Sequence, residues 1–335
     1  MPVDPEFYDA DIVILALNRS EETLQAIASA LGQRGCRFRL VVLDQGSVPE
    51  TQARFRQALA GHSNATLVAS PRNLGVAGGR NAASALGHGR VIVGLDNDAV
   101  FATAHTVAEA VAAFDAMPDL GALGFRIVRH DTGEDDLTSW GYPAGLLARA
   151  GGSFDSVTFV GAGHAIRRVA WDEAGGYDEK LFFCWEEYDF CLRAIEADWR
   201  IRYRGDIVVR HHAAPEARVR WNANRWFYFI RNRIYIGHKT GDGMVALAAR
   251  FAVYLARSLR EGAAIQALRA LPAAIRMAAG TPRRRLSGAA RDYLMRNDSR
   301  YRPALPGQFL AELSGAGRPK ARPRPPHATL PVSPR

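Results

Sequence analysis

The chain has 335 residues, 48% of them hydrophobic and 23% charged, which is typical of a globular protein with one large domain or two smaller ones. Its three cysteines have no C-x-x-C spacing and cannot all pair, which excludes a disulfide framework or a cysteine zinc site. The formal net charge of +9 is uneven, because residues 244–335 hold 17 Lys/Arg against 4 Asp/Glu. We therefore expect this basic third to meet an anionic membrane surface or a nucleic acid.

The first residues, MPVDPEFYDADIVILALN, lack the basic and apolar regions of a signal peptide. No run of about 18 apolar residues occurs, so no membrane-spanning helix is expected. We expect a cytoplasmic protein, either free or peripheral on the inner face of the cell membrane.

Apolar strands alternate with helices over the first part of the chain. The predicted strands are 11–17, 38–47, 65–70 and 90–98, and the predicted helices are 21–31, 51–62, one starting at 78, and 104–116. This order predicts an α/β fold with a parallel sheet covered on both faces. Ligands bind beyond the carboxyl ends of such strands, so we expect the polar residues that follow the strands to gather at one rim. These residues are Asn18, Asp44, Asn73, Asp96 and Asp98.

The pattern is less regular after residue 116. Residues 130–156 are rich in acids and turn residues and predict a long surface loop. The remaining predicted elements are a strand at 158–168, a helix at 186–199, a strand pair or one bent strand at 201–212, and helices over 244–279. The last residues are basic and poor in apolar side chains, which predicts disorder. We expect three parts, 1–240, 241–300 and a disordered tail at 301–335.

Asp96 and Asp98 follow a buried strand with one residue between them. In an extended segment such residues share a side, so both carboxylates could approach one ion. Paired carboxylates suit Mg²⁺ or Mn²⁺, which complete their shell with water and phosphate. The alternative is that D-N-D is only a turn.

Further candidates for nucleotide binding lie near the same rim. Asp44 is placed to accept a hydrogen bond from a base or a ribose. The segment NLGVAGGRNAA brings Gly75, Arg80 and Asn81 to a helix start, where free N–H groups and a cation could hold an anion. Each also has a structural interpretation, as a turn, a loop or a surface salt bridge.

These motifs together resemble a known family, the family 2 inverting glycosyltransferases of the GT-A fold, and in particular their rhamnosyltransferase-like branch. The resemblance rests on LNRSEETLQAIASAL, LVVLDQGS, RNLGVAGGRNAASALGHGRVIVGLDND and VGAGHAIRRVAWDEAGGYDEKLFFCWEEYDFCLRA, and it covers residues 10–240. It implies that Asp44 contacts the base, that Arg80 and Asn81 contact the nucleotide, and that Asp98 binds the metal with Asp96 near the nucleotide sugar. Ala16-Leu17-Asn18 and Gln45 depart from the family pattern and leave the choice of nucleotide open.

The segment FFCWEEYDFCLRA matches the helix start that carries the family's catalytic base, which the resemblance assigns to Glu187, with Glu186 as the rival. An alcohol is a poor nucleophile, and a carboxylate within reach of its proton assists the attack on the anomeric carbon. A position in the first helical turn favours the ionised form of a carboxylate. Asp189 and Arg193 are spaced as a structural ion pair.

Downstream, VVRHHAAP offers His211 and His212 after a strand. The resemblance implies that one of them, preferably His211, ligates the metal or touches the diphosphate, whereas a single histidine is also compatible with a structural role. In the C-terminal helices, Arg250, Arg257 and Arg260 share an arc opposite apolar side chains. That arc predicts either a helix in a membrane interface or a helix packed on the catalytic domain.

We therefore expect a glycosyltransferase that uses Mn²⁺ or Mg²⁺ and inverts the anomeric centre. Its donor would be a UDP- or dTDP-sugar, with rhamnose as a candidate. Its acceptor would be a hydroxyl of a cell-surface glycan, a glycolipid precursor or a small molecule, and its oligomeric state stays open.

Two other functions fit the sequence less well. A nucleic-acid-binding α/β protein would use the basic tail, but the D-x-D acids repel phosphate unless they bind metal, and no recognition motif accompanies them. We therefore expect no nucleic-acid partner. A sugar nucleotidyltransferase would need a glycine-rich loop after the first strand, where this chain has LNRSEET.

Overall fold

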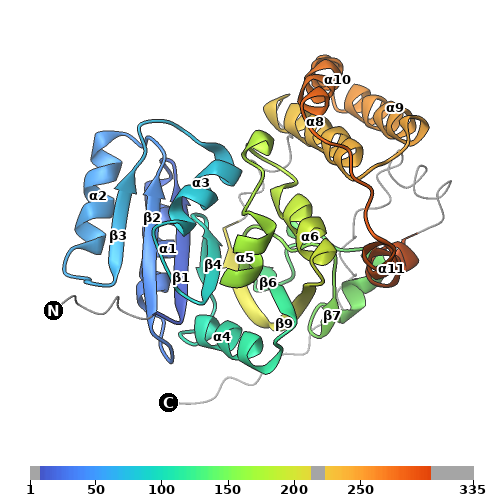
Figure 1. Cartoon of the computed structure of the whole chain (residues 1–335). Coiled ribbons are helices and arrows are strands. Elements are labelled where there is room, and N and C mark those ends of the chain that lie inside the picture. Colours follow the sequence, from blue (N-terminus) through green and yellow to red (C-terminus); the bar gives the residue numbers. More distant parts are fainter. Residues whose placement is uncertain (1–7, 213–222, 303–335) are drawn as a thin grey trace, which may run out of the picture.

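The computed structural model describes residues 8–212 and 223–302 (Figure 1). These residues form a nine-stranded sheet in the order β3-β2-β1-β4-β8-β6-β9-β5, with β7 paired to β9. The strands are β1 (Ala10–Ala16), β2 (Phe38–Asp44), β3 (Ala65–Ala69), β4 (Val91–Asp96), β5 (Ala99–Phe101), β6 (Leu120–Arg129), β7 (Ser153–Asp155), β8 (Gly163–Arg167) and β9 (Arg200–His211). The tail predicted at 301–335 lies outside the described residues from 303 onward.

Helices cover both faces of the sheet. The helices with buried residues in these two layers are α1 (Ser20–Leu31), α2 (Pro49–Leu59), α3 (Gly75–Ser84), α4 (Thr106–Ala116), α5 (Arg168–Ala174), α6 (Glu186–Glu196) and α11 (Gly288–Asn297). Alternate residues of β1 point to opposite faces: Ile12 and Ile14 pack with α1, α2 and α4, whereas Val13 packs with α3, α5, α6 and α11. The α/β fold with a sheet between helical layers is thus confirmed.

The parallel half of the sheet aligns the ends of three strands. β1 pairs in parallel with both β2 and β4, and the register sets Ala16 opposite Asp44 and Leu15 opposite Asp96. The two acids therefore end neighbouring strands on either side of β1. This arrangement confirms the expected rim of polar residues at the carboxyl ends of β2 and β4.

The second half of the sheet differs from the prediction in three ways. β6 was not predicted, because glycines interrupt its apolar run: a Cβ on Gly124 would lie 2.3 Å from the Tyr142 hydroxyl oxygen. β9 is one strand whose pairing with β6 shifts in register, so the bent strand was the correct alternative. The surface loop predicted at 130–156 is wrong, because Asp136, Tyr142 and Phe154 in it are buried.

The C-terminal helices form a separate group. α8 (Ala223–Lys239), α9 (Met244–Arg260) and α10 (Ala264–Ala279) share their own apolar core, while α11 returns to the sheet, where the Tyr293 hydroxyl bonds the backbone of Ile201. Figure 1 shows α8, α9 and α10 grouped together apart from the sheet. The predicted boundary at residue 240 stays a prediction, and it falls between α8 and the two helices that α8 packs against. Four short 3-10 helices complete the fold, at Leu137–Ser139, Ala144–Arg149, Glu179–Leu181 and Ser299–Tyr301.

Two members of the arginine arc predicted on α9 make contacts inside this group of helices, whereas Arg260 is exposed. Arg250 Nη1 lies 2.6 Å from Asp242 Oδ2, and the Arg257 guanidinium lies 5.3 Å from the centre of the Trp226 ring. Phe251 and Leu255 pack into the core that α8, α9 and α10 share. The middle of the apolar face of α9 is therefore covered by α8 and α10, whereas Val245 and Leu259 near its two ends are exposed.

A buried ion pair joins the start of the sheet to α5. Arg168 Nη2 lies 2.6 Å from Asp11 Oδ2, which also accepts a hydrogen bond from the Gly89 amide, and the Asp11 side chain is 1% exposed. Burial raises the pKa of Asp11, and the Arg168 charge opposes that shift. The Arg168 charge therefore offsets the cost of an ionised carboxylate in the interior.

We expect Arg168→Ala to lower the free energy of unfolding by about 3–5 kcal/mol, because it leaves the Asp11 charge buried and unpaired. Urea-induced unfolding followed by circular dichroism measures this change. Arg90→Ala is the control, because the Arg90–Asp115 pair is solvent-exposed and its loss should cost about 1 kcal/mol or less. Equal losses in the two variants would contradict the prediction.

Candidate active site

The end of β2 is held by a closed set of hydrogen bonds. Asp44 is fully buried and accepts hydrogen bonds from the amide and hydroxyl of Ser47 and, at 2.7 Å, from Gln52 Nε2. The Ser47 hydroxyl in turn accepts a hydrogen bond from the Asn18 amide at 2.7 Å. Asn18 and Asp44, which were predicted to contact the nucleotide, thus shape the same loop.

Gln45 links this loop to the next polar segment, since its Oε1 accepts a hydrogen bond from the Leu74 amide at 2.9 Å. Asn73 Oδ1 accepts a hydrogen bond from the Gly75 amide at 2.8 Å. Gly75 has a φ of 74°, and a Cβ there would lie 2.3 Å from the Phe182 carbonyl oxygen. Only glycine therefore allows the two segments to approach this closely.

The N-terminus of α3 is occupied by the protein itself. The amides of Val76 and Ala77 donate hydrogen bonds to the Phe182 carbonyl at 2.6 and 3.3 Å. The sequence predicted free N–H groups here that would hold an anion, so this part of the prediction is corrected. Asn81, also predicted at the nucleotide, exchanges hydrogen bonds with the backbone of Tyr177 and donates one to Glu179.

Arg80 and Asp96 form an ion pair at the end of β4. Arg80 Nη2 lies 3.0 Å from Asp96 Oδ1, and Arg80 also donates a hydrogen bond to the Val13 carbonyl. The Arg80 side chain is 3% exposed, whereas that of Asp96 is 40% exposed. Arg80 therefore pairs with Asp96 from the interior of the protein and leaves part of the Asp96 carboxylate open to solvent.

Asp98 lies against a histidine from the far end of the sheet. Asp98 Oδ1 is 3.2 Å from His211 Nε2, and Asp98 Oδ2 is 2.5 Å from Arg19 Nη1. The antiparallel pairing of Ala99 with His211 brings the two residues together. On its other side, His211 Nδ1 lies 3.0 Å from Asp136 Oδ2.

Only two of the three residues predicted as metal ligands are in contact with each other. Asp98 and His211 are in contact, while Asp96 is paired with Arg80. Among the residues that the structure describes, no group of three or more His, Cys, Asp or Glu side chains is placed to hold a metal ion. Asp98 and His211 are therefore two neighbouring candidate ligands, and an oxygen-rich ligand such as a diphosphate would have to complete the shell of a cation.

Glu186 and Glu187 begin α6 in an apolar environment. Glu186 is 2% exposed and Glu187 is partly buried. Burial raises the pKa of Glu187 to about 7, and the nearby Asp96 charge adds to this shift. Burial and the Glu187 charge raise the pKa of Glu186 well above its usual range, and within the described part of the chain Glu186 Oε2 is buried without a hydrogen-bond partner.

These shifts give the two glutamates different properties. Glu187 ionises near neutral pH, as a general base requires, whereas the raised pKa of Glu186 favours its protonated form. Gly161 makes room for the Glu187 carboxylate, because a Cβ there would lie 2.4 Å from Glu187 Oε1.

The loop before α6 is backbone-strained and clamped by α8. Phe182, Cys184 and Trp185 have φ values of 60°, 70° and 74°, which are costly for residues other than glycine. Asn232 Nδ2 lies 2.8–2.9 Å from the carbonyl oxygens of Leu181, Phe183 and Cys184. The Asn232 amide thus holds the loop that orients the two glutamates.

Sequence reasoning missed two residues of this site. Arg19 follows the first strand and pairs with Asp98, but nothing in its local pattern separates it from a surface arginine. Asp136 was assigned to a surface loop, yet it is 4% exposed and supports His211. The one available signal was its D-L-T-S context, in which its carboxylate accepts hydrogen bonds from Thr138 and Ser139.

The comparison with protein families agrees with this geometry. The model of the family described as Glycosyl transferase family 2 matches residues 11–175, which run from β1 into α5 and include Asp44, Asp96 and Asp98. Residues 11–175 thus resemble a glycosyltransferase family 2 domain, which supports the predicted resemblance at the level of the family. The activity of the whole chain and its place in the rhamnosyltransferase-like branch stay predictions.

Individual relatives support the fold. Succinoglycan biosynthesis protein ExoU of Rhizobium meliloti (strain 1021) is 28% identical over 227 residues, which cover 64% of this chain and 63% of ExoU, so the chain spans less than two thirds of that relative. Mannosyltransferase PcManGT from Pyrobaculum calidifontis, in complex with GDP-Man and Mn²⁺, superposes with a TM-score of 0.56 at 19% identity over 93% of this chain and 87% of that one. GalNAc-T7 with UDP, GalNAc and Mn²⁺ superposes with a TM-score of 0.57 at 14% identity, over 77% of this chain and 52% of that one.

We expect Asn232→Ala to lower the free energy of unfolding by about 2–3 kcal/mol, because the carbonyl groups of Phe183 and Cys184 lose this donor, while that of Leu181 keeps Arg231. It should also lower kcat for sugar transfer more than it raises KM, because the glutamates lose their orientation. Urea unfolding and steady-state kinetics measure both effects.

Asn64→Ala provides a matched control for Asn232→Ala. The Asn64 amide donates a single hydrogen bond, to the Phe38 carbonyl, so its loss should cost about 1 kcal/mol and leave kcat unchanged. Wild-type stability and wild-type kcat in Asn232→Ala would contradict the clamping role.

Proposed function

We propose that the chain transfers a sugar from a nucleoside-diphosphate donor to an acceptor hydroxyl, inverts the anomeric centre and depends on Mn²⁺ or Mg²⁺. The observation that carries the proposal is a partly buried glutamate, Glu187, whose pKa is about 7 beside the Asp96–Arg80 pair at the ends of the parallel strands. A base that is ionised at neutral pH and an acid-lined rim for the donor are the two groups that inverting transfer requires.

Glu187 is the proposed catalytic base. The ionised carboxylate accepts the proton of the acceptor hydroxyl as the oxygen attacks the anomeric carbon. Glu186, kept neutral by burial, limits the negative charge near Glu187. Glu186 is the second candidate for the base, and its neutral state makes it the weaker one.

The donor would bind along the carboxyl ends of β1, β2 and β4. Asn18, Asp44, Asn73 and Gly75 are proposed to form the wall around the base and ribose. Asp96 would face the sugar with its open side, held in place by Arg80 from below. Asn81 supports this wall through its bonds to Tyr177.

Asp98 and His211 are proposed to hold the divalent cation. The contact between His211 Nδ1 and Asp136 fits this role, because metal-binding histidines commonly donate their second N–H to a carboxylate. Asp98 also pairs with Arg19, which would help to hold its carboxylate in place. When bound, a divalent cation supplies positive charge that stabilises a departing diphosphate.

The donor and acceptor follow from chemistry and from relatives. The predicted donors are UDP- and dTDP-sugars, including a rhamnosyl donor. The complexes of PcManGT with GDP-Man and of GalNAc-T7 with UDP add GDP-sugars to the set to be tested. The name of ExoU supports a glycan precursor as the acceptor.

A cytoplasmic location is part of this proposal. Within residues 8–212 and 223–302, no helix is long and apolar enough to cross a bilayer.

We expect Glu187→Gln to lower kcat by about 10²–10⁴-fold, because the amide cannot accept the hydroxyl proton. For the wild type, the transfer rate should rise with pH through about 7 and then level off, because the ionised carboxylate is the active form. Glu196→Gln, at the other end of α6, is the control and should keep wild-type kcat. Wild-type activity in Glu187→Gln would contradict the role, and loss of activity only in Glu186→Gln would move the role to the rival.

We expect Mn²⁺ to tighten the binding of UDP, dTDP or GDP by at least about tenfold, because a cation at Asp98 and His211 would join the protein to the diphosphate. Titration calorimetry with each nucleotide, with and without Mn²⁺, measures this effect. Asp98→Asn should abolish it, and Asp136→Asn should weaken Mn²⁺ binding by about 10–100-fold. Asp115→Asn, far from the site, is the control. Nucleotide binding that is equal with and without metal would contradict the assignment.

A further inference from the structure

Helix α10 presents three of its large apolar side chains, Ile265, Leu268 and Ile275, to solvent and its alanines to the protein. Ala267, Ala270 and Ala274 are buried against the neighbouring helices. One exposed stripe of the helix, spaced three and four residues apart, consists of Ile265, Leu268, Arg269, Pro272, Ile275 and Arg276. We call it the α10 outer stripe. A helix of a globular protein normally has the opposite orientation, so this stripe needs a partner to cover it.

The exposure of the apolar members is high. Ile265, Leu268 and Ile275 are 68%, 58% and 58% exposed, and Leu259, at the end of α9 next to the start of α10, is 61% exposed. These side chains lie in the part of the molecule where α8, α9 and α10 are grouped apart from the sheet (Figure 1). The stripe is therefore accessible to a flat surface without a change in the fold.

The charge around the stripe is positive. Residues 244–279 contain five arginines and a single acid, Glu261. Arg269 and Arg276 are part of the stripe itself, and Arg260 is exposed just before it. Exposed apolar side chains flanked by arginines match the headgroup boundary of an anionic bilayer, into which the apolar groups insert while the arginines meet phosphates. A second copy of the stripe would bring like charges together, which opposes self-association through this face.

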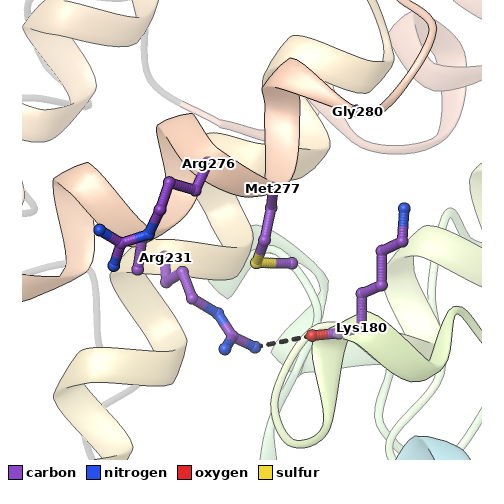
Figure 2. Close-up of a pocket in the computed structure, with 6 residues that line it drawn as sticks. Lys180, Arg231, Arg276, Met277 and Gly280 are labelled. Atoms are coloured by element: carbon purple, nitrogen blue, oxygen red, sulfur yellow. Dashed lines mark hydrogen bonds between the residues drawn. The ribbon is translucent and has the colours of Figure 1, made fainter.

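A basic hollow adjoins the C-terminal end of the stripe. It has a volume of about 400 Å³ and is lined by Arg276, Ala273, Met277 and Gly280 with Arg231 of α8 and Lys180 of the 3-10 helix before α6. Figure 2 shows Arg231 donating a hydrogen bond to the Lys180 carbonyl, with the side chains of Lys180 and Arg276 on either side of it. Three cationic side chains at the edge of an apolar stripe offer a place for a lipid phosphate.

We propose that the α10 outer stripe docks the protein on an anionic lipid bilayer, with headgroup phosphates in the hollow between Lys180, Arg231 and Arg276. The apolar side chains of the stripe enter the headgroup boundary, and α10 lies along the surface. The proposal does not depend on the sugar, the metal or the catalytic base.

Co-sedimentation with vesicles tests the proposal on the full chain. Phosphatidylcholine vesicles with and without 30% phosphatidylglycerol are the two arms, in low and high salt. We expect binding to the vesicles that contain phosphatidylglycerol to be at least about tenfold stronger than to phosphatidylcholine alone, and to weaken in high salt. Equal binding to both vesicles, or no binding to either, would overturn the proposal.

Paired variants separate the stripe from general surface charge. L268D/I275D and R269E/R276E should each lower binding to the phosphatidylglycerol vesicles by at least about tenfold. M295D/R296E, on the exposed face of α11, is the matched control and should bind within about twofold of wild type. The substituted side chains are exposed, so circular dichroism should show an unchanged fold. Sedimentation velocity tests the alternative occupant. If the wild type were a dimer and L268D/I275D a monomer, the stripe would bind a second copy of the chain, and the proposal would be overturned.

Discussion

The carbonyl group of Phe182 connects the parts of the molecule on which the site depends. It accepts the first amide hydrogen bonds of α3, which belongs to the parallel half of the sheet. Phe182 is also the first residue of the strained loop that leads into α6, and Asn232 of α8 holds the neighbouring carbonyls. One short segment therefore fixes the proposed donor side, the two glutamates and the C-terminal helices relative to one another. The strained backbone lies next to the proposed catalytic glutamates, and backbone strain is common at active sites.

This arrangement explains why acidic groups in such proximity are tolerated. Glu186, Glu187 and Asp96 would repel one another if all were ionised, but burial keeps Glu186 neutral and brings the pKa of Glu187 to about 7. Arg80 compensates the third charge from a buried position. The remaining charge is that of Glu187, which changes near neutral pH. The free energy of unfolding should fall as pH rises from about 4.5 through 7, because the ionised Glu187 carboxylate is desolvated in the folded protein.

Much of this was predictable from local patterns, and the failures share a physical cause. The parallel strands, the rim acids Asp44 and Asp96, and the helix that starts at Glu186 follow from apolar runs and their ends. β6 was missed because Gly121 and Gly124 make room for Trp199 and Tyr142, which are distant in sequence. Arg19 and Asp136 were missed because their partners, Asp98 and His211, are defined by strand pairing. The free amides expected at the start of α3 were wrong, because the amides of Val76 and Ala77 bond the carbonyl of Phe182, about 100 residues later.

The ionisation of Glu187 near neutral pH is the central claim, and it can be observed without substrate. Carbon-13 labelling of the glutamate carboxyl groups, followed by an NMR pH titration, reports the pKa of each one. We expect a single carboxyl signal with a midpoint at about 7 that is absent in Glu187→Gln and moves to lower pH in Asp96→Asn, because the Asp96 charge raises the Glu187 pKa. The account would be contradicted if no glutamate had a midpoint near 7, that is, if all glutamates that ionise below pH 9 had midpoints close to the ordinary value of 4.5.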